Sequence, residues 1–138
     1  MDHQAMERKL RDVFDSGDPK KLAEAMKEMA AQDFVQEWPQ SGERIRGLDN
    51  VTALNEQYEQ ATGTSPQMTV RRIVPPGDAW IVEATIDYGD GVPVSAVTIF
   101  ETNADGQLVH ETDYFASPFE APEWRRKFVE QMEPVGAR

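Results

Sequence analysis

The spacing of apolar residues changes from helical to alternating at Gln67, and that change limits the folds open to this chain. Before Gln67, apolar side chains recur three or four residues apart, which predicts amphipathic helices. After it, they alternate with polar ones, which predicts strands over 67–74, 79–88, 92–102 and 108–115. The connections are short and rich in turn formers, so neighbouring strands should be antiparallel. They are Pro75-Pro76-Gly77-Asp78, Gly89-Asp90-Gly91 and Asn103-Ala104-Asp105-Gly106. Helices followed by a four-stranded meander predict an α+β fold.

Three helices are expected before the strands. The first lies between Asp2, which can cap it, and Gly17, which can end it. Asp18 and Pro19 form a cap and first helical position for a second helix, which should end near Gln32.

The segment between the second and third helices should hold a short strand over 34–38 and a polar loop or hairpin over 39–47. The third helix is then capped by Asp49 or Asn50 and ends at Thr62-Gly63. A last helix is predicted after Pro122. Its apolar side chains should pack back on the sheet or on the first helices, and they are Trp124, Phe128 and Met132.

Length and charge set the broad class. The 138 residues predict a single domain over 1–138, and the net charge of −11 is concentrated between residues 47 and 124, where Arg71 and Arg72 are the only bases. That sign of charge disfavours nucleic acid and anionic membranes as partners. The chain has no cysteine, no leader-like start and no apolar run of membrane length, so a cytoplasmic location is expected. Two histidines without a neighbouring carboxylate at ligand spacing give little support for a metal site.

The order of elements and two local motifs carry a resemblance. The motifs are Glu37-Trp38-Pro39-Gln40-Ser41-Gly42-Glu43-Arg44-Ile45-Arg46-Gly47 and Asp105-Gly106-Gln107-Leu108-Val109-His110-Glu111-Thr112-Asp113-Tyr114-Phe115. Over nearly its whole length the chain resembles the SnoaL-like group of the nuclear transport factor 2-like superfamily. The resemblance implies a cone-shaped, cystatin-like fold, with three N-terminal helices, a curved antiparallel sheet and a C-terminal helix around an apolar pocket. Members include polyketide cyclases, limonene-epoxide hydrolase-like enzymes, steroid isomerases, dehydratases and accessory domains without chemistry, and fold alone does not choose among them.

The resemblance also implies catalytic residues. Asp113 matches the acidic position that serves as general acid or base in the cyclases and activates water in the epoxide hydrolases. Asp87 matches the second carboxylate of those hydrolases, but Thr85 stands where they have the arginine that bridges their two acids. Two buried carboxylates without that guanidinium would repel each other, and one would be held protonated. The resemblance supplies no metal ligand and no cofactor.

Strand parity leaves the position of Asp113 open. The more apolar face of the strands opposes Glu83, Asp87, Glu111 and Asp113, and it consists of Trp80, Val82, Ala84, Ile86, Val94, Ala96, Phe100, Leu108 and Tyr114. On parity alone the four acids face solvent or a dimer partner, and across the sheet they can pair with Arg71 or Arg72. A bulge that shifts the register would turn Asp113 inward. His110 falls on the face opposite Asp113, so a catalytic pair of these two residues is not expected.

Four further residues are candidates to bind a ligand. Trp38 and Tyr58 each carry an apolar body with a polar group that needs a partner when buried. Glu37 is an acid for the pocket mouth, and Phe34 is an apolar lining residue. The alternative for all such aromatic residues is that they simply fill the core.

The sequence therefore predicts a protein that binds a small apolar molecule, polyketide-, terpene- or steroid-like. Asp113 would then act as acid or base in cyclisation, isomerisation or hydration. The alternatives are a ligand-binding module without turnover, and a dimeric accessory domain whose cavity is filled by its own side chains. A homodimer formed through the outer face of the sheet is expected, because helices cover only one face and large apolar residues on the other face would need a partner.

Overall fold

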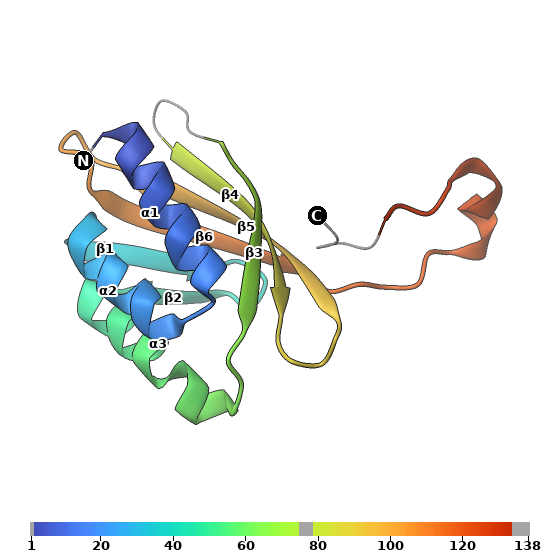
Figure 1. Cartoon of the computed structure of the whole chain (residues 1–138), viewed down its shortest axis with the longest axis horizontal. Coiled ribbons are helices and arrows are strands. Elements are labelled where there is room, and N and C mark those ends of the chain that lie inside the picture. The colour runs from blue at the N-terminus through green and yellow to red at the C-terminus, as the bar shows by residue number, and fades with distance from the viewer. Residues whose placement is uncertain (1, 75–78, 134–138) are drawn as a thin grey trace.

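The computed structural model describes residues 2–74 and 79–133, and the turn expected at 75–78 lies outside them. The chain folds as helices first and strands second, in agreement with the expected α+β class (Figure 1). The helices are α1 (His3–Ser16), α2 (Pro19–Met29) and α3 (Leu48–Thr62). The strands are β1 (Ala30–Trp38), β2 (Glu43–Arg46), β3 (Gln67–Val74), β4 (Ala79–Asp87), β5 (Pro93–Thr102) and β6 (Leu108–Ala116).

Local chemistry explains where the first two helices begin and end. The Asp2 carboxylate accepts from the backbone N–H of Ala5, and Asp18 accepts from that of Lys20, so both aspartates act as the expected N-caps. Gly17 ends α1 in the left-handed conformation with φ of 63°. α2 stops at Met29 instead of Gln32, because residues 30–33 already belong to β1.

The third helix begins two or three residues earlier than expected from a cap at Asp49 or Asn50. Gly47 is its N-cap and makes no side-chain hydrogen bond, while Asn50 donates to the carbonyl of Arg46. Gly63 ends α3 in the left-handed conformation, as the Thr62-Gly63 pair predicted.

The six strands form one sheet in the order β2-β1-β6-β5-β4-β3. The predicted meander of β3 to β6 is antiparallel throughout, and β1 and β2 form an antiparallel hairpin. The expectation of a wholly antiparallel sheet fails at one place, because β1 pairs with β6 in parallel. Parallel neighbours need a long connection, and here α3 and four strands separate β1 from β6 in the chain. All three helices lie over one face of the curved sheet (Figure 1).

The hydrophobic core lies between that face and the helices. It joins α1 and α2 to the inner side of the strands through residues such as Leu10, Met26, Phe34, Val82 and Phe100, each at most 1% exposed. Phe14 and Phe100 bring α1 onto β5 with ring centroids 6.4 Å apart.

The prediction of a packed C-terminal helix is wrong. Residues 117–133, which we call the C-terminal arm, contain only a short 3₁₀ helix, η1 (Glu123–Phe128), and project from the body (Figure 1). Trp124, Phe128 and Met132 are 73%, 73% and 76% exposed. Their spacing is helical, but spacing alone does not supply the surface against which an amphipathic helix is stabilised.

Candidate functional site

A cavity of about 150 Å³ lies between the inner face of the sheet and the helices. Apolar side chains from α1, α3 and the strands form most of its wall. The polar groups that line it are Asp18, Gln36, Trp38, Asn55, Tyr58, Tyr88, Thr98, Glu111 and Asp113. None of the described residues around it is Lys, Arg or His, so its ionisable groups are acids and tyrosines.

Asp113 lines the cavity and accepts hydrogen bonds from three donors. Its Oδ2 accepts from Nε2 of Gln36 at 2.7 Å and from Nε1 of Trp38 at 2.9 Å. Its Oδ1 accepts from the hydroxyl of Thr98 at 2.7 Å. The side chain is 4% exposed, and these donors replace the water that a carboxylate loses on burial. Hydrogen bonds of this kind stabilise the charged form.

Glu111 lies beside Asp113, and its surroundings make the charged form of its carboxyl group unfavourable. The amide of Gln36 donates to its Oε2 at 2.9 Å and so joins the two carboxyl groups. Burial raises the pKa of Glu111 well above its usual range, and the charge and hydrogen bonding of Asp113 raise it further. The surroundings of Glu111 therefore favour its protonated form.

A bulge explains why these two acids face inward. The β5–β6 register shifts between Glu101, which pairs with His110, and Thr102, which pairs with Leu108. The shift reverses the parity of β6 after Leu108, so Glu111 faces Phe100 and Asp113 faces Thr98 on the inner side. Of the alternatives left by the sequence, the structure has the one in which a bulge turns Asp113 inward.

The same shift corrects the predicted apolar face. Tyr114, which parity placed inside, lies outside and is 46% exposed. Glu83 and Asp87 stay on the outer side, as parity predicted. Glu83 pairs there with Arg71 and Arg72 at 3.8 and 3.7 Å.

The structure brings together some of the predicted site residues. Trp38 and Tyr58 line the cavity with Asp113, and the indole N–H of Trp38 finds its partner in that carboxylate. Phe34 is fully buried in the core instead and does not line the cavity. Asp87 is exposed at the end of β4, where its carboxylate accepts from the N–H of Gly89 at 2.8 Å. Asp87 does not line the cavity, and within the described part of the chain it makes no hydrogen bond to Asp113.

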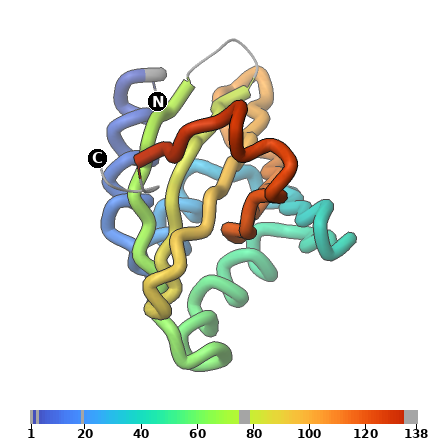
Figure 2. Tube along the Cα trace, turned by 90° about the vertical axis from the view of Figure 1, so that its right-hand side faces the viewer, coloured from blue at the N-terminus to red at the C-terminus, as the bar shows by residue number. Residues whose placement is uncertain are grey.

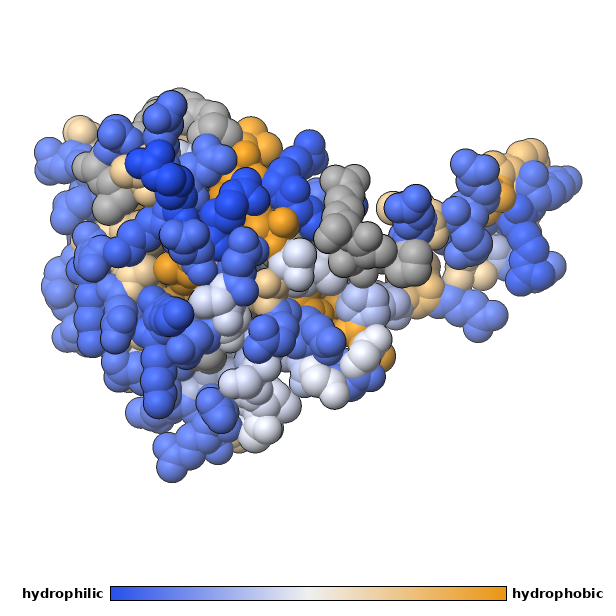
Figure 3. Space-filling view, viewed as in Figure 1, coloured by the Kyte–Doolittle hydropathy of each residue, from blue (hydrophilic) through white to orange (hydrophobic). Residues whose placement is uncertain are grey.

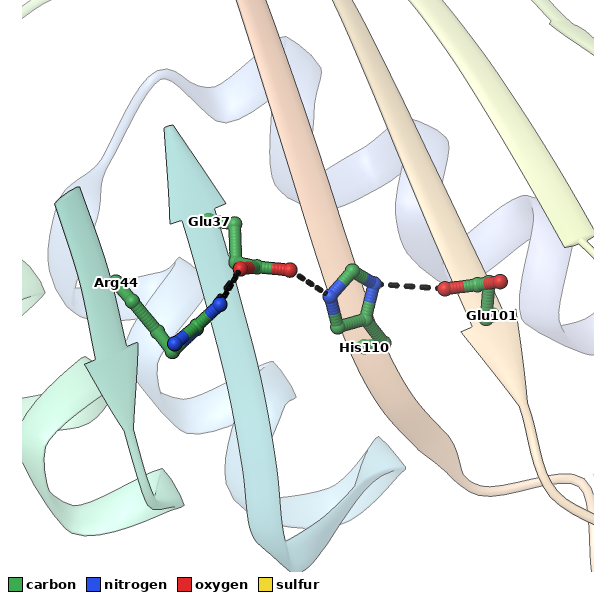
Figure 4. A network of polar contacts seen from close by, with 4 residues as sticks. All are labelled: Glu37, Arg44, Glu101 and His110. Atoms are coloured by element: carbon green, nitrogen blue, oxygen red, sulfur yellow. Dashed lines mark hydrogen bonds and ion pairs between the residues drawn. The ribbon is translucent and has the colours of Figure 1, made fainter. Parts of the chain in front are cut away.

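Glu37 does not reach the cavity either, because strand alternation points it away from its neighbours Gln36 and Trp38. It joins a network on the outer face that runs from Arg44 through Glu37 and His110 to Glu101 (Figure 4). His110 and Arg44 hold the pKa of Glu37 below its usual range, with the hydrogen bond of His110 as the larger cause. His110 therefore lies on the face opposite Asp113, as the strand pattern indicated.

Two members of the site did not stand out as candidates in the sequence. Glu111 was recognised only as one of four strand acids, and Gln36 carried no signal beyond its place in a strand-like run. The contact that matters, one amide between two carboxylates, joins residues 75 and 77 positions apart in the chain. Such a contact becomes visible only when β1 is placed beside β6.

Within residues 2–74 and 79–133, no group of three or more His, Asp or Glu side chains is arranged to hold a metal ion. The same part of the chain has no helix long and apolar enough to cross a membrane.

The family model for the SnoaL-like domain matches residues 8–111. The chain belongs to the SnoaL-like family. The cavity and its carboxyl pair are thus features of a SnoaL-like domain, and the resemblance stated from the sequence is confirmed. A search of curated proteins found no match.

Solved structures place this SnoaL-like chain among nuclear transport factor 2-like proteins. One, a protein of unknown function from Burkholderia xenovorans LB400, is 36% identical, with a TM-score of 0.73 over 94% of this chain and 97% of that one. A proposed ketosteroid isomerase from Kribbella flavida DSM 17836 is 27% identical, with a TM-score of 0.76 over 95% and 90% of the two chains. A proposed SnoaL-like polyketide cyclase from Jannaschia sp. CCS1 is 21% identical, with a TM-score of 0.63 over 78% and 83%, and shares the fold.

Proposed function

We propose that this SnoaL-like protein binds a small, largely apolar carbonyl compound and catalyses proton transfer on it without a cofactor. The observation that carries the proposal is the pair Glu111 and Asp113 in the wall of an apolar cavity, where Asp113 accepts three hydrogen bonds and burial favours the protonated form of Glu111. When one of two neighbouring carboxyl groups is ionised and the other is protonated, the pair supplies a base and an acid at one place.

In the proposed reaction, Asp113 removes a proton from the carbon next to the carbonyl. Negative charge then moves to the carbonyl oxygen, and the proton on Glu111 donates a hydrogen bond to it. Asp113, now protonated, returns the proton to a carbon farther along the conjugated system. The double bond shifts, and both carboxyl groups end in their starting states.

The cavity volume limits the substrate. A cavity of about 150 Å³ is similar to engineered apolar cavities that take up benzene. A single six-membered ring therefore fits the cavity as it stands, and a polyketide-, terpene- or steroid-like molecule would need part of its length outside. Tyr58 and Tyr88 line the cavity and are half-buried.

Isomerisation of 3-cyclohexen-1-one to its conjugated isomer tests the proposal, because the product is detected by ultraviolet absorbance and the ring matches the cavity. We expect saturable turnover by the wild type. Asp113→Asn should lower the rate at least about 100-fold, the usual contribution of a general base, while ligand binding measured by NMR is kept.

Asp87→Asn is the matched control, since it makes the same change on β4 outside the cavity and Asn can still cap Gly89. It should leave turnover unchanged. Turnover that survives Asp113→Asn would exclude Asp113 as the base. Saturable binding of the ketone without product would favour the alternative function, a ligand-binding module.

A further inference from the structure

The register of the sheet places Gln36 beside both acids of the pair. Its strand, β1, runs parallel to β6, and the two strands can be followed in light blue and orange in Figures 1 and 2. Gln36 is aligned with Glu111 in that register. From this position its Nε2 lies 2.9 Å from Oε2 of Glu111 and 2.7 Å from Oδ2 of Asp113. An amide nitrogen carries two hydrogens, so one is available to each acid.

The burial of Gln36 is unusual for a glutamine. Hydrophilic residues dominate the surface of the body in the view of Figure 3, and glutamine is mostly exposed in folded proteins. Gln36 is nevertheless only 9% exposed, and it lines the cavity. A buried polar side chain lowers stability unless it is hydrogen-bonded, so the partners of Gln36 indicate what it does.

Only one end of the amide has partners among the described protein groups. The nitrogen is bonded to both acids, whereas the carbonyl oxygen Oε1 is buried without a hydrogen bond to any of those groups. A buried acceptor without a protein partner does not help the fold, and exceptions of this kind are often found at functional sites. The amide is therefore oriented to serve the two carboxyl groups.

The donors are divided unequally between the two acids. Asp113 accepts from Trp38 and Thr98 as well as from Gln36, and hydrogen bonds of this kind favour a charged carboxylate. Burial and the neighbouring Asp113 raise the pKa of Glu111, and the hydrogen bond from Gln36 acts in the opposite direction and lowers it. Gln36 thus limits how tightly Glu111 holds its proton.

An uncharged side chain with two donors suits such a pair. A lysine between the acids would favour the charged form of both carboxyl groups, and the acid of the pair would be lost. An apolar side chain would give neither acid a donor, and Glu111 would hold its proton more tightly. The amide binds one charged and one protonated carboxyl group without forcing the two into the same state.

We infer that Gln36 is a positioning residue of the pair, which fixes Glu111 and Asp113 relative to each other and keeps the Glu111 proton available to the carbonyl oxygen of the substrate. In the proposed reaction Gln36 touches no reacting atom and acts through the two acids. This inference rests on the proposed function for its catalytic consequence, but the effect of Gln36 on the two carboxyl groups can be measured without turnover.

Two substitutions at position 36 should move the pKa of Glu111 in opposite directions. Gln36→Met keeps the length of the side chain and removes both donors, so that pKa should rise further. Gln36→Lys places a cation between the acids, so the pKa should fall. NMR titration of the Glu111 carboxyl carbon measures both shifts, and far-UV circular dichroism checks that each variant is folded. A residue that only fills space would not give shifts of opposite sign.

Turnover of 3-cyclohexen-1-one provides the second measurement. Gln36→Met should lower kcat at least about tenfold with little change in KM, because the acids are no longer held in their reactive geometry. The proposed reaction needs protonated Glu111, so the rate is lost as pH rises through the pKa of that residue. The alkaline limb of the pH–rate profile should therefore move to higher pH in Gln36→Met and to lower pH in Gln36→Lys.

Gln32→Met is the matched control, because Gln32 is an exposed residue of the same strand and donates to Asp49 at 3.1 Å. It should change neither the pKa of Glu111 nor the turnover.

The outcomes separate this inference from the proposed function. A Glu111 pKa that is the same in the wild type and in the position-36 variants would overturn the role of Gln36, whatever the turnover. Shifts of the expected signs in a protein that does not convert the ketone would support that role and would count only against the proposed reaction. If one of the two variants does not fold, the pKa shift in the other decides.

Discussion

The indole N–H of Trp38 donates to Oδ2 of Asp113 across 2.9 Å, and this bond joins β1 to β6 where those strands run parallel. The same oxygen accepts from Gln36, two residues earlier in β1. Alternate residues of one strand thus hold an acid of the neighbouring strand. The parallel pairing that the sequence did not reveal is therefore what supplies two of the three donors to Asp113.

Trp38→Phe should destabilise the fold, because it removes a donor from a buried carboxylate and keeps most of the ring. The expected loss is about 1–3 kcal/mol in the free energy of unfolding, measured by urea denaturation. Trp124→Phe is the matched control: that residue is 73% exposed, and the change should stay within about 0.5 kcal/mol. Equal effects at the two positions would contradict the importance of the bond to Asp113.

Glu111→Gln should change how stability depends on pH. The folded protein raises the pKa of Glu111, so the wild type keeps the proton when the unfolded chain has lost it. Its stability should therefore fall as pH rises above about 4.5, by up to about 1.4 kcal/mol per pH unit, until the folded-state pKa is passed. The glutamine variant lacks this loss, so the two stability curves should diverge with rising pH.

Glu83→Gln, which removes an acid from the outer face, is the control for that experiment and should not reproduce the divergence. Parallel curves for the wild type and Glu111→Gln would mean that Glu111 ionises as it does in the unfolded chain.

Gly17→Ala should destabilise the protein more than Gly63→Ala. Both glycines are left-handed helix ends, with φ of 63° and 73°, and each substitution costs about 1–2 kcal/mol for that conformation. At Gly17 an added Cβ would also lie 2.9 Å from the carbonyl oxygen of Pro66 and 3.1 Å from Cα of Gln67, whereas at Gly63 it meets nothing within 4 Å. Thermal unfolding of both variants measures the difference, and similar losses would argue against close packing of α1 on the start of β3.

The outer-face network should respond to His110→Asn (Figure 4). The hydrogen bond of His110 is the largest single cause that lowers the pKa of Glu37, so its loss should raise that pKa toward 4.5. Arg44→Gln removes the hydrogen bond and the charge of Arg44 and should raise the pKa of Glu37 as well. NMR titration of the Glu37 carboxyl carbon measures both. Because the pKa is lowered in the folded state, the contribution of Glu37 to stability should be present above the unfolded pKa and lost as pH falls.

The sequence by itself determined the elements whose signals are local. Asp2, Asp18 and Gly17 mark helix ends because caps and left-handed turns depend on neighbouring residues, and alternation marks the four strands of the meander for the same reason. The family resemblance pointed to Asp113, which lines the cavity.

Tertiary structure decided what depends on distant pairing. A shift of one residue at the β5–β6 bulge reverses which side chains face inward, and alternation along β6 gives no sign of it. That shift, with the parallel placement of β1, brings Gln36 between Glu111 and Asp113 and leaves Asp87 and Glu37 outside. The helical spacing of the arm predicted packing that does not occur: an amphipathic helix is stabilised by the surface it packs against, and no residue of η1 is buried.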